Sequence, residues 1–300
     1  SGDYNVAVGY DGLTANTTGV SNTAIGYDAL KANTTGYRNI AIGMGAYDGA
    51  DTEHNNLAIG YDALGGAIDD GTYNVAIGNY SLDANTEGDY GTGVGYNALT
   101  SNTTGQRNTV IGASALATNT TGNYNTASGY EALTSNTTGN GNTASGYEAL
   151  KDANRTADTD GYNTALGYQA GNTGTNDVTT GNKNTLLGAS TAASASAGTN
   201  QTVIGYGASG KGDNTVTIGN GDITLWSATD DNEVDLGSSS VEFKDLYIDG
   251  TANLDAVDID GGAIDGAAVG ANSASTGAFT TVTASTSLDV TGSAGVILEN

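Results

Sequence analysis

The sequence has no cysteine and no proline, and it is poor in charge and in aromatic residues other than tyrosine. Its 300 residues include one Met, one Trp, two Phe and one His. Without cysteine there is no disulfide framework, no thiolate metal site and no cysteine nucleophile. No run of about 18 apolar residues is present, so we expect no transmembrane helix. No basic segment precedes an apolar stretch, so we also expect no signal peptide in these residues.

The few charges are mostly negative. Only 14% of the residues are charged, whereas an average globular chain has roughly 25%. The 33 Asp and Glu outnumber 8 Lys and Arg, which gives a net charge of −25. The last 80 residues hold 14 of the acids and a single base, Lys244. Such an acidic surface repels phosphate, and we therefore expect neither nucleic acid nor an anionic membrane as a partner.

The sequence does contain a long internal repeat, Asn-Thr-Ala-Ile-Gly-Tyr-x-Ala-Leu, whose glycine we call the anchor. Most anchors lie 17 residues apart, and two of the spacings are 21 residues. The anchors are Gly9, Gly26, Gly43, Gly60, Gly78, Gly95, Gly112, Gly129, Gly146, Gly167, Gly188, Gly205 and Gly219. This period is too short for repeated helical hairpins. It predicts an all-β protein, with residues 1–220 forming a repetitive parallel β-solenoid of about thirteen coils, each with two short strands and two turns.

Two neighbouring positions of the repeat differ sharply in size. The residue before the anchor is mostly Ile, Val or Leu, and the residue before that is mostly Ala. Neighbours on a strand face opposite sides. We expect the bulky row to fill the interior of the coil and the alanine row to face outward. The bulky row includes Ile25, Ile42, Ile59 and Ile111. Ser128 and Ser145 interrupt it, which predicts looser packing in the eighth and ninth coils.

Asparagine and glycine recur at fixed places for separate reasons. Asn stands four residues before the anchor in ten of the thirteen coils, as at Asn22, Asn39, Asn56 and Asn108. Stacked amides of this kind hydrogen-bond along a ladder. The anchors, such as Gly26, Gly43, Gly60 and Gly112, allow a backbone angle or a close approach that a Cβ forbids. The recurrent Asn-Thr-Thr-Gly predicts a second turn.

A coil of 17 residues encloses little volume, so a repeat of this kind buries its remaining apolar face against neighbours. We therefore expect several chains to pack side by side. The Asn-Thr-Ala-Ile-Gly repeat resembles the β-roll heads of trimeric autotransporter adhesins, and its longer form resembles repeats of bacteriophage tail fibres. The resemblance implies a left-handed β-roll in a homotrimeric fibre.

The repeat ends near residue 220, and residues 221–300 have another character. The stretches 235–250 and 264–283 resemble segments of phage tail fibres. Ile259, Ile264 and Val269 recur every five residues between Gly and Asp, a spacing typical of a thin intertwined β-stalk built by three chains. We therefore predict a β-rich stalk over residues 221–300.

Residues that carry chemistry are scarce. A Ser-His-Asp site would need His54, the only histidine, which we interpret as a solvated loop residue. The carboxylates Asp255, Asp258, Asp260 and Asp265 either bind a hard cation such as Ca²⁺ or form a solvated acidic face. Their spacing does not match an EF-hand loop, and we favour the solvated face. No nucleotide-binding loop is present. We therefore predict no enzyme activity, no catalytic residues, no metal site and no cofactor.

Tyrosine is concentrated at two positions of the repeat, one residue after and five residues before the anchor. These positions hold 13 of the 17 tyrosines. The rings either stack on sugars or form a structural ladder between coils, and we favour the ladder.

The pattern predicts a structural and adhesive fibre segment, most similar to a phage tail fibre that mediates or supports attachment to the host. Its expected location is extracellular, on the virion. A bacterial trimeric adhesin head and a polysaccharide-degrading tailspike are the alternatives. An ice-binding solenoid would need a regular Thr-x-Thr face, which is not seen. The expected partners are the chain itself and a glycan or protein of the host surface. The two 21-residue spacings either carry binding loops or are spacers.

Overall fold

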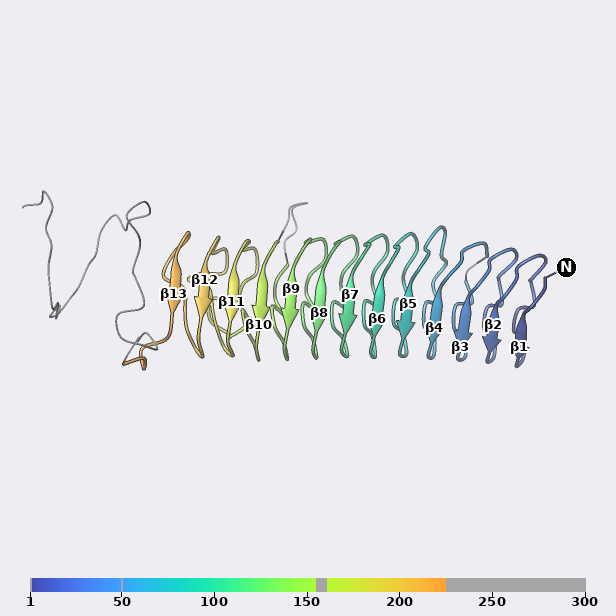
Figure 1. Cartoon of the computed structure of the whole chain (residues 1–300), viewed down its shortest axis with the longest axis horizontal. Helices are drawn as coiled ribbons and strands as arrows, with labels where there is room; N and C mark the ends of the chain where they lie inside the picture. The colour runs from blue at the N-terminus through green and yellow to red at the C-terminus, as the bar shows by residue number, and fades with distance from the viewer. Residues whose placement is uncertain (1, 50, 155–160, 225–300) are drawn as a thin grey trace, which may run out of the picture. The chain divides into compact units, whose positions relative to one another are not determined.

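The computed structural model describes residues 2–49, 51–154 and 161–224, and in these residues it shows a solenoid without helices. Each coil contributes one strand of three residues (Figure 1). The strands are β1 Val6–Val8, β2 Thr23–Ile25, β3 Ile40–Ile42, β4 Leu57–Ile59, β5 Val75–Ile77, β6 Thr92–Val94, β7 Thr109–Ile111, β8 Thr126–Ser128, β9 Thr143–Ser145, β10 Thr164–Leu166, β11 Thr185–Leu187, β12 Thr202–Ile204 and β13 Val216–Ile218.

All thirteen strands form one parallel sheet in chain order. Equivalent repeat positions are in register, so that Ala24 pairs with Ala41 and Ile25 pairs with Ile42. Twelve turns of the solenoid thus separate β1 from β13. At about 4.8 Å per strand the sheet is about 60 Å long. The prediction of a parallel β-solenoid is confirmed.

The prediction of two strands in each coil is wrong, because among the described residues the rest of each coil consists of turns. Non-glycine residues with positive φ end the extended conformation on both sides of a strand. In the coil of β7 these are Arg107 (56°), Ser114 (54°) and Leu116 (49°). Left-handed residues break β pairing and cost about 1–2 kcal/mol each. The chain tolerates them because a neighbouring coil accepts their backbone hydrogen bonds. The Leu116 N–H donates to the Ala132 carbonyl of the next coil at 2.9 Å, and the Ser114 N–H donates to the Tyr96 carbonyl of the preceding coil at 2.8 Å.

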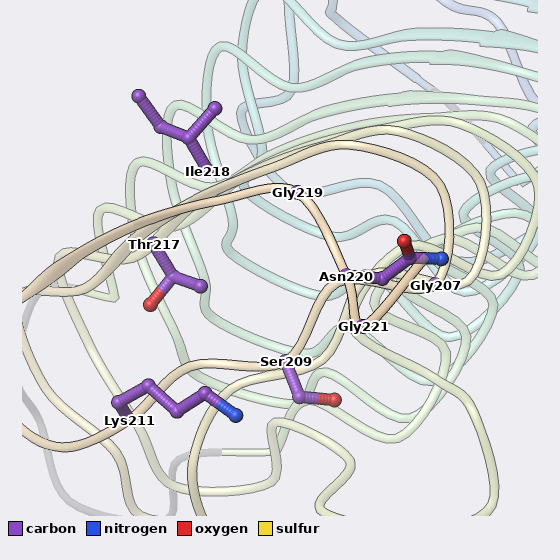
Figure 2. Close-up of a pocket in the computed structure, with 8 residues that line it drawn as sticks. All are labelled: Gly207, Ser209, Lys211, Thr217, Ile218, Gly219, Asn220 and Gly221. Carbon is purple, nitrogen blue, oxygen red and sulfur yellow. The ribbon is translucent and has the colours of Figure 1, made fainter. Parts of the chain in front are cut away.

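The core is built from alanine and leucine, so the predicted strand faces are reversed. Val110, two residues before its anchor, is fully buried, whereas Ile111 is 52% exposed. Figure 2 shows the same alternation in β13, where Thr217 and Ile218 point to opposite sides of the strand. The interior opposite the strand is already filled by a row of leucines four residues after the anchors. The fully buried members of this row are Leu30, Leu64, Leu82, Leu99, Leu116, Leu133 and Leu150. Alanine is the commonest buried strand residue facing this row, and Val110, Leu186 and Val203 are the larger exceptions.

The reversal also changes the role of the two serines. Ser128 and Ser145 lie on the outside of the sheet, and Ala127 and Ala144 are buried beneath them. The expected loosening of the eighth and ninth coils is therefore wrong. The bulky residues Ile25, Ile42, Ile59 and Ile111 face outward as well and are half-buried or exposed.

The asparagine ladder is confirmed and is buried. The backbone N–H of Asn39 donates to Asn22 Oδ1 at 2.9 Å, and Asn22 Nδ2 donates to the Gly36 carbonyl at 2.7 Å. Each amide thus satisfies one backbone group of the next coil and one of the second turn. The same pattern includes Asn56, Asn74, Asn108, Asn125, Asn163 and Asn184, whereas Asn142 Nδ2 donates to Asn125 Oδ1 of the preceding coil. An unpaired buried backbone group costs about 1–3 kcal/mol, so this row is required in the core.

The Asn-Thr-Thr-Gly turns form a second ladder. Asn119 Nδ2 donates to the Gly122 carbonyl at 3.0 Å within its own turn, and to Asn102 Oδ1 of the preceding coil at 2.8 Å. The hydroxyl of Thr103 donates to the Thr120 carbonyl at 3.0 Å. Each turn is therefore held by its neighbour as well as by its own residues.

At the anchor glycines there is no room for a side chain between successive coils. Gly43 has a φ of 140°, and a Cβ built on it would lie 2.1 Å from the carbonyl oxygen of Gly60. Equivalent contacts recur from Gly9 to Gly188. A side chain at this position is excluded both by φ and by the next backbone.

The chain divides into two units, Ser1–Ser227 and Ala228–Asn300, and the described residues all belong to the first. The predicted stalk over residues 221–300 lies almost wholly outside the described residues, as do Asp255, Asp258, Asp260 and Asp265. These interpretations stay predictions.

Replacement of an anchor tests this contact. We expect Gly43→Ala to destabilise the solenoid by about 3 kcal/mol or more, because the new Cβ clashes and φ is one that alanine avoids. Gly12→Ala is the matched control, since a Cβ there meets only ordinary contacts at 3.7 Å and beyond. Thermal unfolding followed by circular dichroism should show a large fall for the first variant and none for the second. An equal midpoint for both would contradict this account of the glycine row.

Candidate functional site

The most extensive feature of the surface is the outward side of the sheet. We call the residues one and three positions before the anchors the outer face. It contains Val8, Ile25, Ile40, Ile111, Leu166 and Ile218 among the large apolar residues that are exposed. None of its positions holds a charged residue in any of the thirteen strands. On a chain with a net charge of −25, this face is a continuous neutral strip about 60 Å long.

Tyrosine rows border the outer face on both sides. After the anchors, Tyr130 and Tyr147 stack with ring centroids 5.3 Å apart, and Tyr147 and Tyr168 stack at 5.2 Å. Before the strands, Tyr73 and Tyr90 stack at 5.0 Å and 3°. Stacking in the direction of the coils covers ring faces that a sugar would need. The geometry supports the structural ladder.

His54 belongs to one of these aromatic rows. Its ring stacks on Tyr37 at 4.5 Å and 10°, and meets Tyr73 edge-on at 5.9 Å. The residue is half-buried. His54 lies in an irregular segment and is partly exposed, as expected of a loop histidine, but two tyrosines cover part of its ring. His54 stands six residues before its anchor Gly60, and Tyr37 stands six residues before Gly43. This shared repeat position indicates in the sequence that the two rings stack.

The two borders carry charges of opposite sign. Five residues before their anchors stand Arg38, Arg107 and Lys183, and this row contains no acid. Arg107 lies over the rings of Tyr90 and Tyr124, at 5.6 and 5.5 Å from their centroids. Two residues after the anchors stand Asp11, Asp28, Asp62, Glu131 and Glu148, and this row contains no base. We call these rows the basic edge and the acidic edge.

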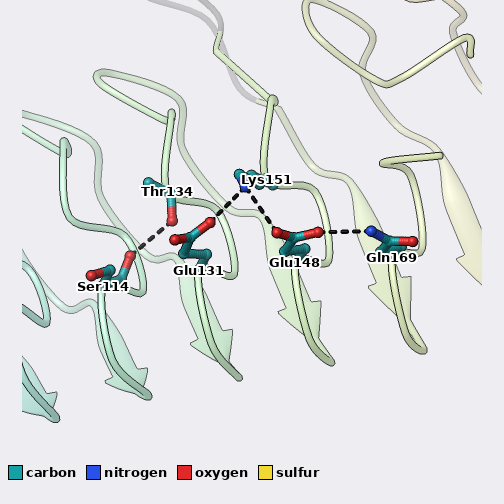
Figure 3. Close-up of polar contacts among 6 residues, drawn as sticks. All are labelled: Ser114, Glu131, Thr134, Glu148, Lys151 and Gln169. Atoms are coloured by element: carbon teal, nitrogen blue, oxygen red, sulfur yellow. Dashed lines mark hydrogen bonds and ion pairs between the residues drawn. The ribbon is translucent and has the colours of Figure 1, made fainter. Parts of the chain in front are cut away.

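Lys151 neutralises part of the acidic edge. Its ammonium lies 2.6 Å from Glu131 and 2.9 Å from Glu148, and Gln169 donates to Glu148 at 2.7 Å (Figure 3). These contacts connect the coils of β8, β9 and β10. The hydrogen bonds that Lys151 donates to Glu131 and Glu148 raise the pKa of Lys151. The hydrogen bond from Gln169, and then that from Lys151, lowers the pKa of Glu148. The pairs are partly exposed, so each contributes at most about 1 kcal/mol.

Nearer the N-terminus one acid of the edge is paired, since the ammonium of Lys31 lies 3.0 Å from Asp28. Asp28, Met44, Asp48 and Asp62 line a shallow hollow, where Gly45 replaces a side chain of the edge. Burial, and then the charge of Asp62, raise the pKa of Asp48. The same two causes raise the pKa of Asp83. No group of three or more His, Cys, Asp or Glu in the described part of the chain is arranged to hold a metal ion.

The carboxylates around Asp62 predict a pH dependence of stability. The folded-state pKa values of Asp48 and Asp83 are raised above the unfolded value of about 3.9. The cost of charging these buried carboxyl groups, to which Asp62 adds repulsion, is therefore absent below that pH and destabilises the fold as pH rises through the raised values. We expect Asp62→Asn to increase the thermal midpoint at pH 7 and to have little effect near about pH 3. The exposed Asp69→Asn is the control, and a gain that persists in acid would contradict the assignment.

One insertion of the repeat is folded onto the solenoid. In the coil of β10, Gly171 occupies the leucine position, and the buried Val178 returns to it, donating its N–H to the Gly171 carbonyl at 2.9 Å. Asp177 accepts the N–H of Gly174 at 2.8 Å and closes the loop. The other insertion includes residues 155–160, which lie outside the described residues. A binding role for either loop stays a prediction.

A second hollow lies at the last described coil. Ser209, Lys211, Thr217 and Asn220 contribute to its lining, and the Oγ1 of Thr217 is buried without a hydrogen-bond partner among the described residues (Figure 2). We assign no ligand to this hollow.

Comparison with protein families finds no matching family model, and comparison with curated proteins finds no significant match. Within residues 2–49, 51–154 and 161–224, no helix has the length and apolar character needed to cross a membrane. The functional argument therefore depends on the geometry of the outer face and its edges.

Proposed function

We propose that this chain is a structural and adhesive segment of a homotrimeric fibre, most similar to a phage tail fibre, which carries or supports attachment to a host cell surface. The outer face is the observation that carries the proposal. Exposed apolar patches larger than a few hundred Å² mark interaction sites on soluble proteins. Here the strip has no charged residue in any coil, although the chain carries a net charge of −25.

The rest of the coil supports the same role. Its backbone and buried amides are bonded from coil to coil along one axis, which is an arrangement for rigidity over a length. The exposed tyrosines stack on one another, and the charged residues form long rows. The resemblance of the repeat to phage tail fibres and to adhesin heads gives the class of fibre. Extracellular location on a virion is part of this proposal.

Assembly is tested by mass and by a pair of adjacent substitutions. We expect light scattering on the native particle to give about three times 29.7 kDa. Ile111→Asp should leave the coil folded but shift the particle to monomer, because it puts a charge on the outer face. Val110→Asp should unfold the coil, because burying a polar group without a hydrogen-bond partner costs about 2–7 kcal/mol and burying a charged carboxylate costs more. A folded wild-type monomer would refute the trimer.

Attachment is tested separately with the native fibre. Labelled fibre is expected to sediment with a subset of bacterial strains, and the Ile111→Asp variant should lose this binding if the assembled particle is required. The same incubations report on the tailspike alternative. Appearance of reducing ends from capsule or lipopolysaccharide would assign a degrading activity in place of a purely adhesive one.

A further inference from the structure

A periodic outer face leaves the axial alignment of two chains undetermined. Shifting one copy by a single coil again brings Ile, Val or Leu opposite the same residue types. Antiparallel pairing would bury similar side chains. A fibre built on such a face therefore needs a feature that distinguishes one alignment from the others.

The eighth and ninth strands provide such a feature. β8 presents Thr126 and Ser128 outward, and β9 presents Thr143 and Ser145. In these two coils alone of the thirteen, both outward residues of the strand are hydroxyl residues. We call them the polar window. It lies off-centre, with seven strands before it and four after it.

The window is matched over the full length of the rod in one alignment only. In a parallel, unshifted assembly each window faces the windows of the other copies, and hydroxyls meet hydroxyls. After a shift of one coil, Ser145 of one copy still faces Ser128 of the other, but the remaining Ser128 faces Ile111 and the remaining Ser145 faces Leu166. Antiparallel pairing about the middle strand places the window opposite Ile77 and Val94. Buried hydroxyls without partners are unfavourable, so the shifted alignments are disfavoured.

The edges favour a ring over a two-fold dimer. In a cyclic assembly the same two edges of neighbouring copies meet, one from each copy, at every interface. In an unshifted ring Arg38 would then lie level with Gly45 of the next copy, one coil from Asp28 and Asp62, and Arg107 would lie level with Ser114, one coil from Glu131. Opposite charges at matched edges fix orientation and suppress wrong pairings.

The available area is adequate for such a contact. A strip about 60 Å long and about 10 Å wide, the length of a three-residue strand, covers on the order of 600 Å². The tyrosine borders widen it toward the roughly 800 Å² that each partner contributes to a stable interface.

We infer that the outer face binds further copies of this same chain in a parallel, unshifted ring, with the polar window setting the axial alignment and the basic edge of each copy meeting the acidic edge of the next. The inference rests on the proposed fibre and specifies the partner surface and its alignment.

A spin label near one end of the rod tests the alignment. The chain has no cysteine, so Thr18→Cys, in an exposed second turn, gives a single labelling site. Pulsed dipolar spectroscopy on the assembled particle should give one narrow distance between labels. Adding Ser128→Ile and Ser145→Ile should broaden it into populations offset along the axis by multiples of about 4.8 Å. Ser128→Thr with Ser145→Thr, which keeps the hydroxyls, should preserve the narrow distance.

The edges are tested by charge reversal. Arg38→Glu with Arg107→Glu should raise the concentration needed for assembly at low salt, and adding Asp62→Lys with Glu131→Lys in the same chain should restore it. A trimer whose label distance stays narrow when the window is filled would overturn the role of the window. If neither charge reversal changes the concentration needed for assembly, the edge pairing is wrong. A monomeric wild type would overturn the proposed fibre itself, and its mass distinguishes that result from the other two.

Discussion

Successive coils meet at the anchor glycines with no side chain between their backbones, and the remainder of the fold depends on this contact. The position of a Cβ on Gly43 is already taken by the carbonyl of Gly60. This contact holds the coils at the spacing of paired strands. Every other repeat position must then stack on its equivalent, which is why asparagines, leucines and tyrosines each form rows.

The rows divide the stabilising interactions between the inside and the outside of the coil. Inside, the amides of Asn22 and its equivalents satisfy backbone groups that water cannot reach, and leucines fill the space that remains. Tyr47 shows the limits of this interior. It takes the place of a leucine, its hydroxyl accepts a hydrogen bond from Asn56, and burial followed by the charge of Glu53 raises its pKa. Outside, stacked rings and opposite edges border a neutral strip.

The sequence alone predicted the solenoid, the anchors and the asparagine ladder, because each follows from strict repetition at one position. It did not reveal which side of the strand is inside. Alternation places Val110 and Ile111 on opposite sides of the strand but does not show which side faces the interior. Bulkier residues usually fill a core, so the sequence predicts Ile111 inside. Leu116 and its equivalents decide which side is inside, because they already fill the interior. They reach it from a left-handed backbone conformation that no local sequence pattern indicates. The single strand per coil has the same origin. The basic and acidic edges could not be predicted from the sequence, because repeat positions do not show on which side of the outer face each residue lies.

The direction of the hydrogen bonds gives the rod a particular response to tension. Bonds such as that from the Leu116 N–H to the Ala132 carbonyl run along the axis, so a pull on the two ends loads all the junctions between coils in series. The junction that yields first determines the breaking force. When it yields, the covalent chain stays intact. The 17 residues of one coil unfold into about 55–60 Å of extended chain, where the folded coil spans about 4.8 Å of the rod. A rod of this design absorbs a sudden load by lengthening one coil at a time, and the remaining coils stay folded.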